Sequence, residues 1–222
     1  MATLGLIGSG MIGGTVARLS VAAGHEVVLS NSRGPQTLTD LAAELGPLAR
    51  AATAAEAAAA GDLVVVAIPL KAYGSVPVEP LAGKTVLDTS NYYPQRDGQI
   101  AELDSGSVTS TELLQRHLPD SAVVKVFNNI FFRHLLSLSR QSGAADRTFL
   151  PIAGDDPGAK SAVTAFLDSI GYGAVDAGPL AEGWRQQPGR PAYGAPYGTF
   201  DNEAGQPAGA DAVRAALAEA RR

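Results

Sequence analysis

The sequence of 222 residues predicts an α/β protein with a doubly wound, mostly parallel sheet. Three observations predict this class. Short β-rich runs alternate with segments whose apolar residues fall at helical spacing. The run Asp62–Ile68, apolar after its first residue, is typical of a central parallel strand covered on both faces. The chain also opens with a strand, a glycine-rich turn, a helix and a second strand, which is the start of a doubly wound sheet.

The opening stretch carries the most specific motif. Thr3–Ile7 reads as a buried strand, G-S-G-M-I-G follows at once, and a helix begins at Met11, ends at Gly24 and leads to a second strand at Glu26–Leu29. A G-x-G-x-x-G in this context predicts a Rossmann-type dinucleotide site, in which glycines allow a tight turn, close approach of a pyrophosphate and tight helix–strand packing. Free N–H groups at the helix start would bind the phosphates. The residues expected to hold the cofactor here are Gly8, Ser9, Gly10, Met11, Ile12 and Gly13. A purely structural glycine turn is the alternative.

The end of the second strand predicts NADP rather than NAD. NAD sites usually place an acid there for the ribose hydroxyls. This chain has Ser30-Asn31-Ser32-Arg33 instead. Arg33 can fork onto a 2′-phosphate, and Asn31 and Ser32 can donate to it, whereas an acid would repel it. The alternative is that Arg33 is a solvated loop residue.

The remaining elements follow from apolar spacing, caps and glycine or proline stops. The expected helices are one capped by Thr37 with Leu38, Leu41 and Leu45 on one side, Thr53–Ala60, one capped by Ser110 and ending at His117, Pro157–Ile170 and Asp211–Arg221. The further strands expected are Leu48–Ala52, Gly83–Asp88, Ser121–Phe127, Thr148–Ala153 and Tyr172–Asp176. Ala72–Val78 reads as a short helix or loop, and Gln95–Gly106 as a loop.

Polar or rigid residues follow three of these strands, where ligands bind in open α/β sheets. We expect cofactor contacts from Ile68, Pro69, Leu70, Asn91 and Asn128. Pro69 would fix the backbone beside the cofactor, and Leu70 would offer an apolar wall. The alternatives are an ordinary turn at Pro69 and, for Asn91, a cap of the turn into Tyr92-Tyr93-Pro94.

The last part of the chain departs from a regular α/β pattern. Residues 1–180 are expected to form the dinucleotide-binding domain, and residues 181–222 a tail. The tail is rich in Pro and Gly but holds Trp184, Tyr193, Tyr197 and Phe200, so it is expected to pack on the body or on a second subunit of a homodimer. Phe131–Leu136 reads as core or as a wall for a flat ring. His134 within it could act as a general acid, although a lone histidine is more often structural.

Composition excludes several classes of function. The formal net charge is −5 without a Lys/Arg cluster, which argues against nucleic-acid binding. Because cysteine is absent, disulfides, thiolate metal sites and a cysteine nucleophile are excluded; the three histidines are too scattered for a local zinc motif. No apolar run approaches the roughly 20 residues of a membrane span, and the N-terminus has no leader pattern. We therefore expect a cytoplasmic protein, and the alanine-rich, lysine-poor composition is associated with GC-rich bacteria.

The chain resembles the NADPH-dependent F420 reductase family. The resemblance rests on GLIGSGMIGGTVARLSVAAGHEVVLSNSRGP, DLVVVAIP, DTSN, KVFNNI, PIAGDDPGAK and DAGPL, in order from Gly5 to Leu180. It implies pyrophosphate binding at residues 9–12 and 2′-phosphate binding at Ser32 and Arg33. It also implies that a deazaflavin stacks near Pro69 and Asn128, with substrate contacts from Asn129, Ile130, Pro179 and Leu180. The departure lies after Leu180, where the family often continues into an apolar helical dimerisation segment.

The resemblance implies an NADP-dependent oxidoreductase that transfers a hydride between NADP(H) and the deazaflavin coenzyme F420. Direct transfer between two planar rings needs alignment rather than an acid/base dyad, so no catalytic or metal-binding residue is predicted. One alternative is an NADPH-dependent reductase of a small imine or carbonyl compound, with Tyr92, Tyr93 or His134 as proton donor. The other is a non-catalytic NADP-binding regulatory protein.

Overall fold

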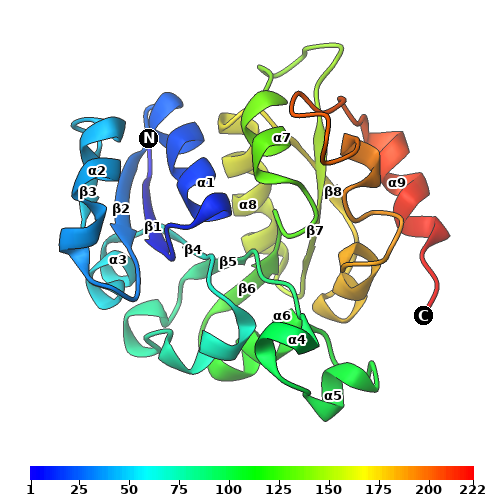
Figure 1. The fold of residues 1–222 in the computed structure, drawn as a ribbon, viewed down its shortest axis with the longest axis horizontal. Coiled ribbons are helices and arrows are strands. Elements are labelled where there is room, and N and C mark those ends of the chain that lie inside the picture. Colours follow the sequence, from blue (N-terminus) through cyan, green and yellow to red (C-terminus); the bar gives the residue numbers. More distant parts are fainter.

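The computed structural model describes residues 1–222 and contains one eight-stranded sheet in the order β3-β2-β1-β4-β5-β6-β7-β8 (Figure 1). The strands are β1 Thr3–Ile7, β2 Glu26–Ser30, β3 Ala49–Ala51, β4 Leu63–Val66, β5 Thr85–Asp88, β6 Ala122–Lys125, β7 Phe149–Gly154 and β8 Gly173–Asp176. All neighbours are parallel except β6 and β7, which are antiparallel. The predicted α/β class with a mostly parallel sheet is confirmed.

Helices and 3₁₀ turns connect the strands. The α-helices are α1 Met11–Ala22, α2 Thr39–Leu45, α3 Ala54–Ala60, α4 Pro94–Asp97, α5 Ala101–Asp104, α6 Ser110–His117, α7 Phe132–Ser137, α8 Pro157–Ser169 and α9 Ala210–Glu219. The 3₁₀ turns are η1 Pro35–Leu38, η2 Leu70–Ser75, η3 Glu79–Leu81, η4 Leu180–Gln186 and η5 Ala195–Tyr197. None of these helices is both long enough and apolar enough to cross a membrane.

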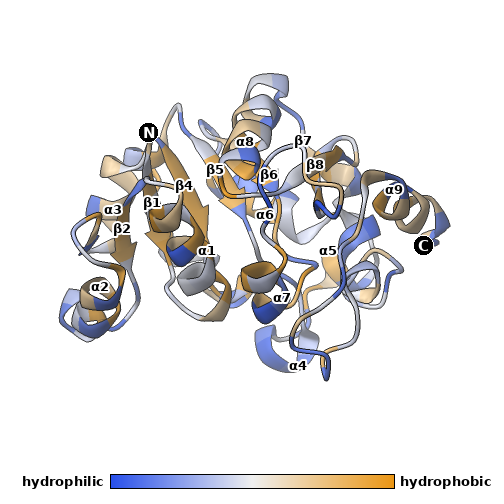
Figure 2. Ribbon diagram, turned by 90° about the horizontal axis from the view of Figure 1, so that it is seen from above, coloured by the Kyte–Doolittle hydropathy of each residue, from blue (hydrophilic) through white to orange (hydrophobic).

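Two hydrophobic clusters lie on opposite faces of the sheet. Val65 belongs to the larger cluster and its neighbours Val64 and Val66 to the smaller one, because successive strand residues point to opposite faces. The larger cluster includes side chains of α1, α7, α8 and α9, and the smaller one side chains of α6, η2 and η3. Figure 2 shows the strands as a hydrophobic centre between helices with hydrophilic outer sides.

Three local expectations were wrong. Thr109, not Ser110, caps α6: its backbone is extended, and it forms a capping box with Glu112. Thr37 does not cap α2 but lies inside η1, where its hydroxyl donates to the carbonyl of Gly34 (2.8 Å). The stretch Gln95–Gly106 is not one loop, because Pro94 begins the single-turn helix α4 and α5 follows it.

The C-terminal segment, residues 181–222, packs against β7 and β8 at one edge of the sheet. Helix α9 contacts both strands, and its Val213 and Leu217 are buried in the larger cluster. Tyr197 is fully buried and donates a hydrogen bond to the carbonyl of Phe149 (3.0 Å). This segment therefore closes one end of the molecule and reaches toward β6. The domain boundary at residue 180 stays a prediction.

His25 gives the fold an expected pH dependence. Its Nδ1 accepts the amide of Ala2 (3.2 Å), and its Nε2 lies 2.8 Å from the hydroxyl of Ser169 in α8. Burial lowers the pKa of His25, so the folded state favours the neutral ring. The unfolded chain therefore binds more protons than the folded one as the pH falls below about 6.5, and stability is lost toward acid pH. We expect the free energy of unfolding, measured by urea denaturation, to fall less between pH 7 and pH 5 in H25Q than in the unmodified protein. Identical pH slopes would contradict this role.

Candidate functional site

A cavity of about 420 Å³ lies at the carboxyl ends of β4, β5 and β6, beside the N-terminus of α1. The strand order reverses between β1 and β4, so the cavity is at the topological switch point where such sheets bind ligands. Its lining residues are Gly10, Met11, Ile12, Ala67, Ile68, Pro69, Thr89, Ser90, Asn91, Tyr93, Arg96, Asn128, Asn129, Ile130, Phe131, Phe132, Tyr193, Gly194 and Phe200.

The glycine turn before α1 forms an open cradle. Gly8 has φ +103°, and a Cβ there would lie 2.3 Å from the carbonyl oxygen of Ala67. A Cβ at Gly13 would lie 2.1 Å from the carbonyl oxygen of Gly8, so both positions require glycine. At Gly10, by contrast, nothing lies within 4 Å, and the start of α1 has no side-chain cap. Free amides and open space at a helix N-terminus fit the pyrophosphate of a dinucleotide.

The loop after β2 carries a positively charged side chain that has no partner in the protein. Arg33 is exposed, and its guanidinium makes no hydrogen bond or ion pair. Asn31 organises the loop: its Oδ1 accepts the amide of Arg33 (2.9 Å), and its Nδ2 donates to Thr37 (2.8 Å). Ser9 is similarly tied to β2, since its hydroxyl donates to the carbonyl of Ser30 (2.9 Å). Ser32 and Arg33 are thus the free donors of this loop, and their chemistry fits a 2′-phosphate.

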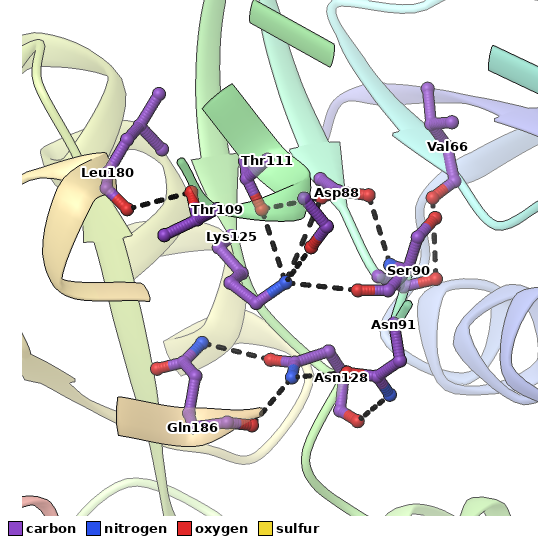
Figure 3. Close-up of polar contacts among 12 residues, drawn as sticks. Val66, Asp88, Ser90, Asn91, Thr109, Thr111, Lys125, Asn128, Leu180 and Gln186 are labelled. Carbon is purple, nitrogen blue, oxygen red and sulfur yellow. Dashed lines mark hydrogen bonds and ion pairs between the residues drawn. The ribbon is translucent and has the colours of Figure 1, made fainter. Parts of the chain in front are cut away.

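The asparagine side chains that follow β5 and β6 bind each other (Figure 3). Asn128 donates to Oδ1 of Asn91 (2.9 Å) and to the carbonyl of Gln186 (2.7 Å). Asn91 donates to the carbonyl of Asn128 (2.7 Å), and Gln186 donates to Oδ1 of Asn128 (2.9 Å). These two asparagines therefore shape the edge of the cavity and join it to the C-terminal segment. No motif or spacing in the sequence indicated that Gln186 would lie beside this site.

Asn129 differs from its neighbour because one of its polar atoms is free. Its Nδ2 donates to the carbonyl of Ala192 (2.7 Å), but its buried Oδ1 has no partner. A buried acceptor without a partner is costly. Asn129 and Ile130 both line the cavity, and Oδ1 of Asn129 lies buried behind its surface.

Leu70, Pro179 and Leu180 are among the predicted site residues that do not line the cavity. Leu70 begins η2 and is buried in the smaller hydrophobic cluster. Leu180 is buried, its amide bonded to Asp155 (2.9 Å) and its carbonyl to Thr109 (3.2 Å). Pro179 precedes it, and both lie outside the cavity. The apolar wall expected at Leu70 and the deazaflavin contacts expected at Pro179 and Leu180 are not part of this cavity and stay predictions.

A buried ion pair lies behind the edge of the cavity (Figure 3). Lys125 and Asp88 are register partners on β6 and β5, their side chains are fully buried, and Nζ lies 4.0 Å from Oδ2. Lys125 also donates to the carbonyl of Ser90 (3.0 Å), and Asp88 accepts the hydroxyls of Thr111 (2.6 Å) and Tyr73 (3.0 Å). Burial lowers the pKa of Lys125, and Asp88 opposes that change. The pair fixes Ser90, which lines the cavity. The one feature of the sequence that could have indicated this ion pair is a lysine inside an apolar strand.

Of the three candidate proton donors, only Tyr93 lines the cavity. His134 is fully buried, and its Nε2 lies 2.6 Å from the carbonyl of Asn202. Tyr92 faces another loop and donates to Asp104 (2.7 Å). Aromatic side chains from α7 and the C-terminal segment complete the wall: Phe131 packs against Phe132 and Phe200 with ring centroids 4.7 and 5.2 Å apart. No group of three His, Asp or Glu side chains that could hold a metal ion is present.

The fold and the site are those of an NADP-dependent oxidoreductase of the Rossmann type. Residues 3–92 match the family of NADP oxidoreductases described as coenzyme F420-dependent. A hypothetical protein, SMa0349 from Sinorhizobium meliloti, is 30% identical over 88% of this chain and 94% of its own, with a TM-score of 0.76. The chain belongs to this family.

Two further structures share the architecture. An Arthrobacter sp. FB24 protein, provisionally described as an F420-dependent NADP reductase, is 25% identical over 82% of this chain and 87% of its own, with a TM-score of 0.68. An imine reductase from Pseudomonas sp. is 18% identical over 81% of this chain and 57% of its own, with a TM-score of 0.58, and shares the fold alone. The protein YjhV of Escherichia coli K12 is 37% identical over 51 residues, which span 37% of that relative's length.

Proposed function

We propose that this protein transfers a hydride between NADP(H) and the deazaflavin coenzyme F420. The observation that carries the proposal is one cavity that joins the open N-terminus of α1 to an aromatic wall. Its volume of about 420 Å³ is within the range of small-molecule sites. The family's description and the description of the Arthrobacter relative support the deazaflavin as the second ligand.

Different residues of the site would bind different parts of the nucleotide and the acceptor. The amides of Met11 and Ile12 would bind the pyrophosphate, while Ser32 and Arg33 would bind the 2′-phosphate. Ile130 and Phe131 would pack on planar rings and exclude water, which protects a hydride in transit. The bound nicotinamide supplies the hydride chemistry, and the chain aligns it with the acceptor. Homodimer formation and a cytoplasmic location stay predictions.

A second candidate is reduction of a small imine or carbonyl compound. The Tyr93 phenol among the residues that line the cavity supports it, because such a substrate, like the deazaflavin, takes up a proton as well as a hydride. The two candidates differ in their acceptor, not in their nucleotide.

The proposed function predicts a colour change. NADPH mixed with the purified protein and oxidised deazaflavin should bleach the visible band of the deazaflavin, and NADH should do so much more slowly. The band is followed by absorbance, with nucleotide binding measured separately by calorimetry. Tight NADPH binding without bleaching would refute the deazaflavin as acceptor, and a screen of cyclic imines and aldehydes would then test the second candidate.

A further inference from the structure

Two phenols meet inside the cavity. Tyr93 follows β5, and Tyr193 lies in the C-terminal segment, 100 residues later; their hydroxyl oxygens are 2.8 Å apart. Neither hydroxyl has another hydrogen-bond partner in the protein, and both residues line the cavity. When two phenols share one hydrogen bond, one O–H is donated and the other remains. The pair therefore always retains one O–H hydrogen without an acceptor in the protein.

The surroundings indicate which phenol has the free O–H hydrogen. Burial raises the pKa of the Tyr193 phenol, as does its hydrogen bond to Tyr93, so Tyr193 is the natural donor within the pair. The O–H hydrogen of Tyr93 is then the one without an acceptor in the protein. The guanidinium of Arg96 lies over the Tyr93 ring, 5.0 Å from its centroid, in a cation–π contact. Asp97 partly offsets this cation, because it accepts two hydrogen bonds from Arg96 (2.9 and 2.8 Å) and one from the Tyr93 amide (3.0 Å).

We propose that Tyr93 is the proton donor of the reaction and that Tyr193 is its positioning residue. The inference rests on the proposed function, since reduction of a conjugated acceptor takes up a hydride and a proton. As the hydride adds to the acceptor carbon, the electron pair of the broken π bond moves to the acceptor nitrogen or oxygen, and Tyr93 gives that atom its phenolic proton. Tyr193 keeps its own proton and stabilises the Tyr93 phenolate by the hydrogen bond it donates. A proton from water then restores Tyr93, and the net reaction consumes NADPH, one proton and the acceptor.

Kinetics of three phenylalanine variants test this assignment. Y93F should lower kcat for deazaflavin reduction by about 10²-fold, which is the lower end of general acid catalysis, with the Kd for NADPH unchanged. Y193F should lower kcat less, because Tyr93 keeps its proton and loses only a hydrogen bond. Y92F is the matched control: its phenol lies outside the cavity, so kcat should stay within about twofold of the unmodified value. The solvent isotope effect on kcat should disappear in Y93F. A Y93F enzyme with nearly full kcat and an unchanged isotope effect overturns the proposal.

A measurement without any ligand separates this proposal from the proposed function. NMR spectra of the six tyrosines, labelled at Cζ and assigned with the same variants, should show a displaced Cζ resonance for Tyr93 in Y193F relative to the unmodified protein. No change would overturn the pairing of the two phenols, whatever the acceptor is. An unmodified protein that leaves the deazaflavin oxidised refutes the proposed function instead. The three variants are then compared with a cyclic imine as acceptor, where an undiminished kcat in Y93F again overturns the proton donor.

Discussion

Replacing Arg33 by alanine is expected to raise the KM for NADPH by about 10- to 100-fold, and to change the KM for NADH by less than about threefold. Each hydrogen bond to a charged group contributes about 1.5–3 kcal/mol, and only NADPH carries the 2′-phosphate. The Arg33 guanidinium is exposed and free of protein partners, so its removal breaks no contact of the fold. Steady-state kinetics with both nucleotides measure the effect.

Two further variants control this experiment. R33K keeps the charge but loses the planar fork, so its KM for NADPH should lie between those of R33A and the unmodified protein. R214A removes the same charge from α9, where Arg214 pairs only with Asp211, and should leave both KM values unchanged. Equal increases for NADPH and NADH in R33A would show that Arg33 does not recognise the 2′-phosphate.

Replacing Lys125 by methionine is expected to lower the free energy of unfolding by about 3–5 kcal/mol. Methionine keeps most of the volume but leaves the buried carboxylate of Asp88 without its cation, and breaking one partner of a buried pair carries this cost. Urea denaturation monitored by circular dichroism measures the loss. Because the Lys125 ammonium also holds the carbonyl of Ser90, the affinity for NADPH should fall as well.

The double variant D88N/K125M distinguishes a charge effect from a packing effect. It removes both charges, so it should recover a substantial part of the stability lost in K125M. K71M changes an exposed lysine whose side chain makes no hydrogen bond, and it should stay within about 0.5 kcal/mol of the unmodified protein. If K125M were as stable as K71M, the ion pair would contribute nothing to the fold.

Local patterns in the sequence were enough to predict the eight strands and the helices α1, α3, α8 and α9. The strand–turn–helix of residues 3–22 was predictable because Gly8 and Gly13 have no alternative in so tight a turn. The opposite direction of β7 was not predictable in this way. Direction is set by which strands pair, and the hydrogen bonds between β6 and β7 depend on the connection through α7 rather than on either strand's composition.

The candidate site was predictable where it is built from strand ends and not where it is built from distant segments. Pro69, Asn91 and Asn128 follow strands, so the topology brings them to one edge. Gln186 and Tyr193 reach that edge across 58 and 100 residues of sequence, through hydrogen bonds that no spacing encodes. Leu180 lies outside the cavity lining, since its tertiary contacts with Asp155 and Thr109 hold it elsewhere.

The hydrogen bonds of Gln186 and Tyr193 to residues after β5 and β6 have an evolutionary consequence. The glycine turn and Arg33 belong to the first 33 residues, whereas the aromatic wall draws on Tyr193 and Phe200 as well as on the residues after β6. The proposed function thus places nucleotide preference and acceptor preference in separate stretches of the gene. Mutagenesis restricted to the later stretch can search for new acceptors while the enzyme keeps its reductant, which makes this scaffold a practical start for directed evolution.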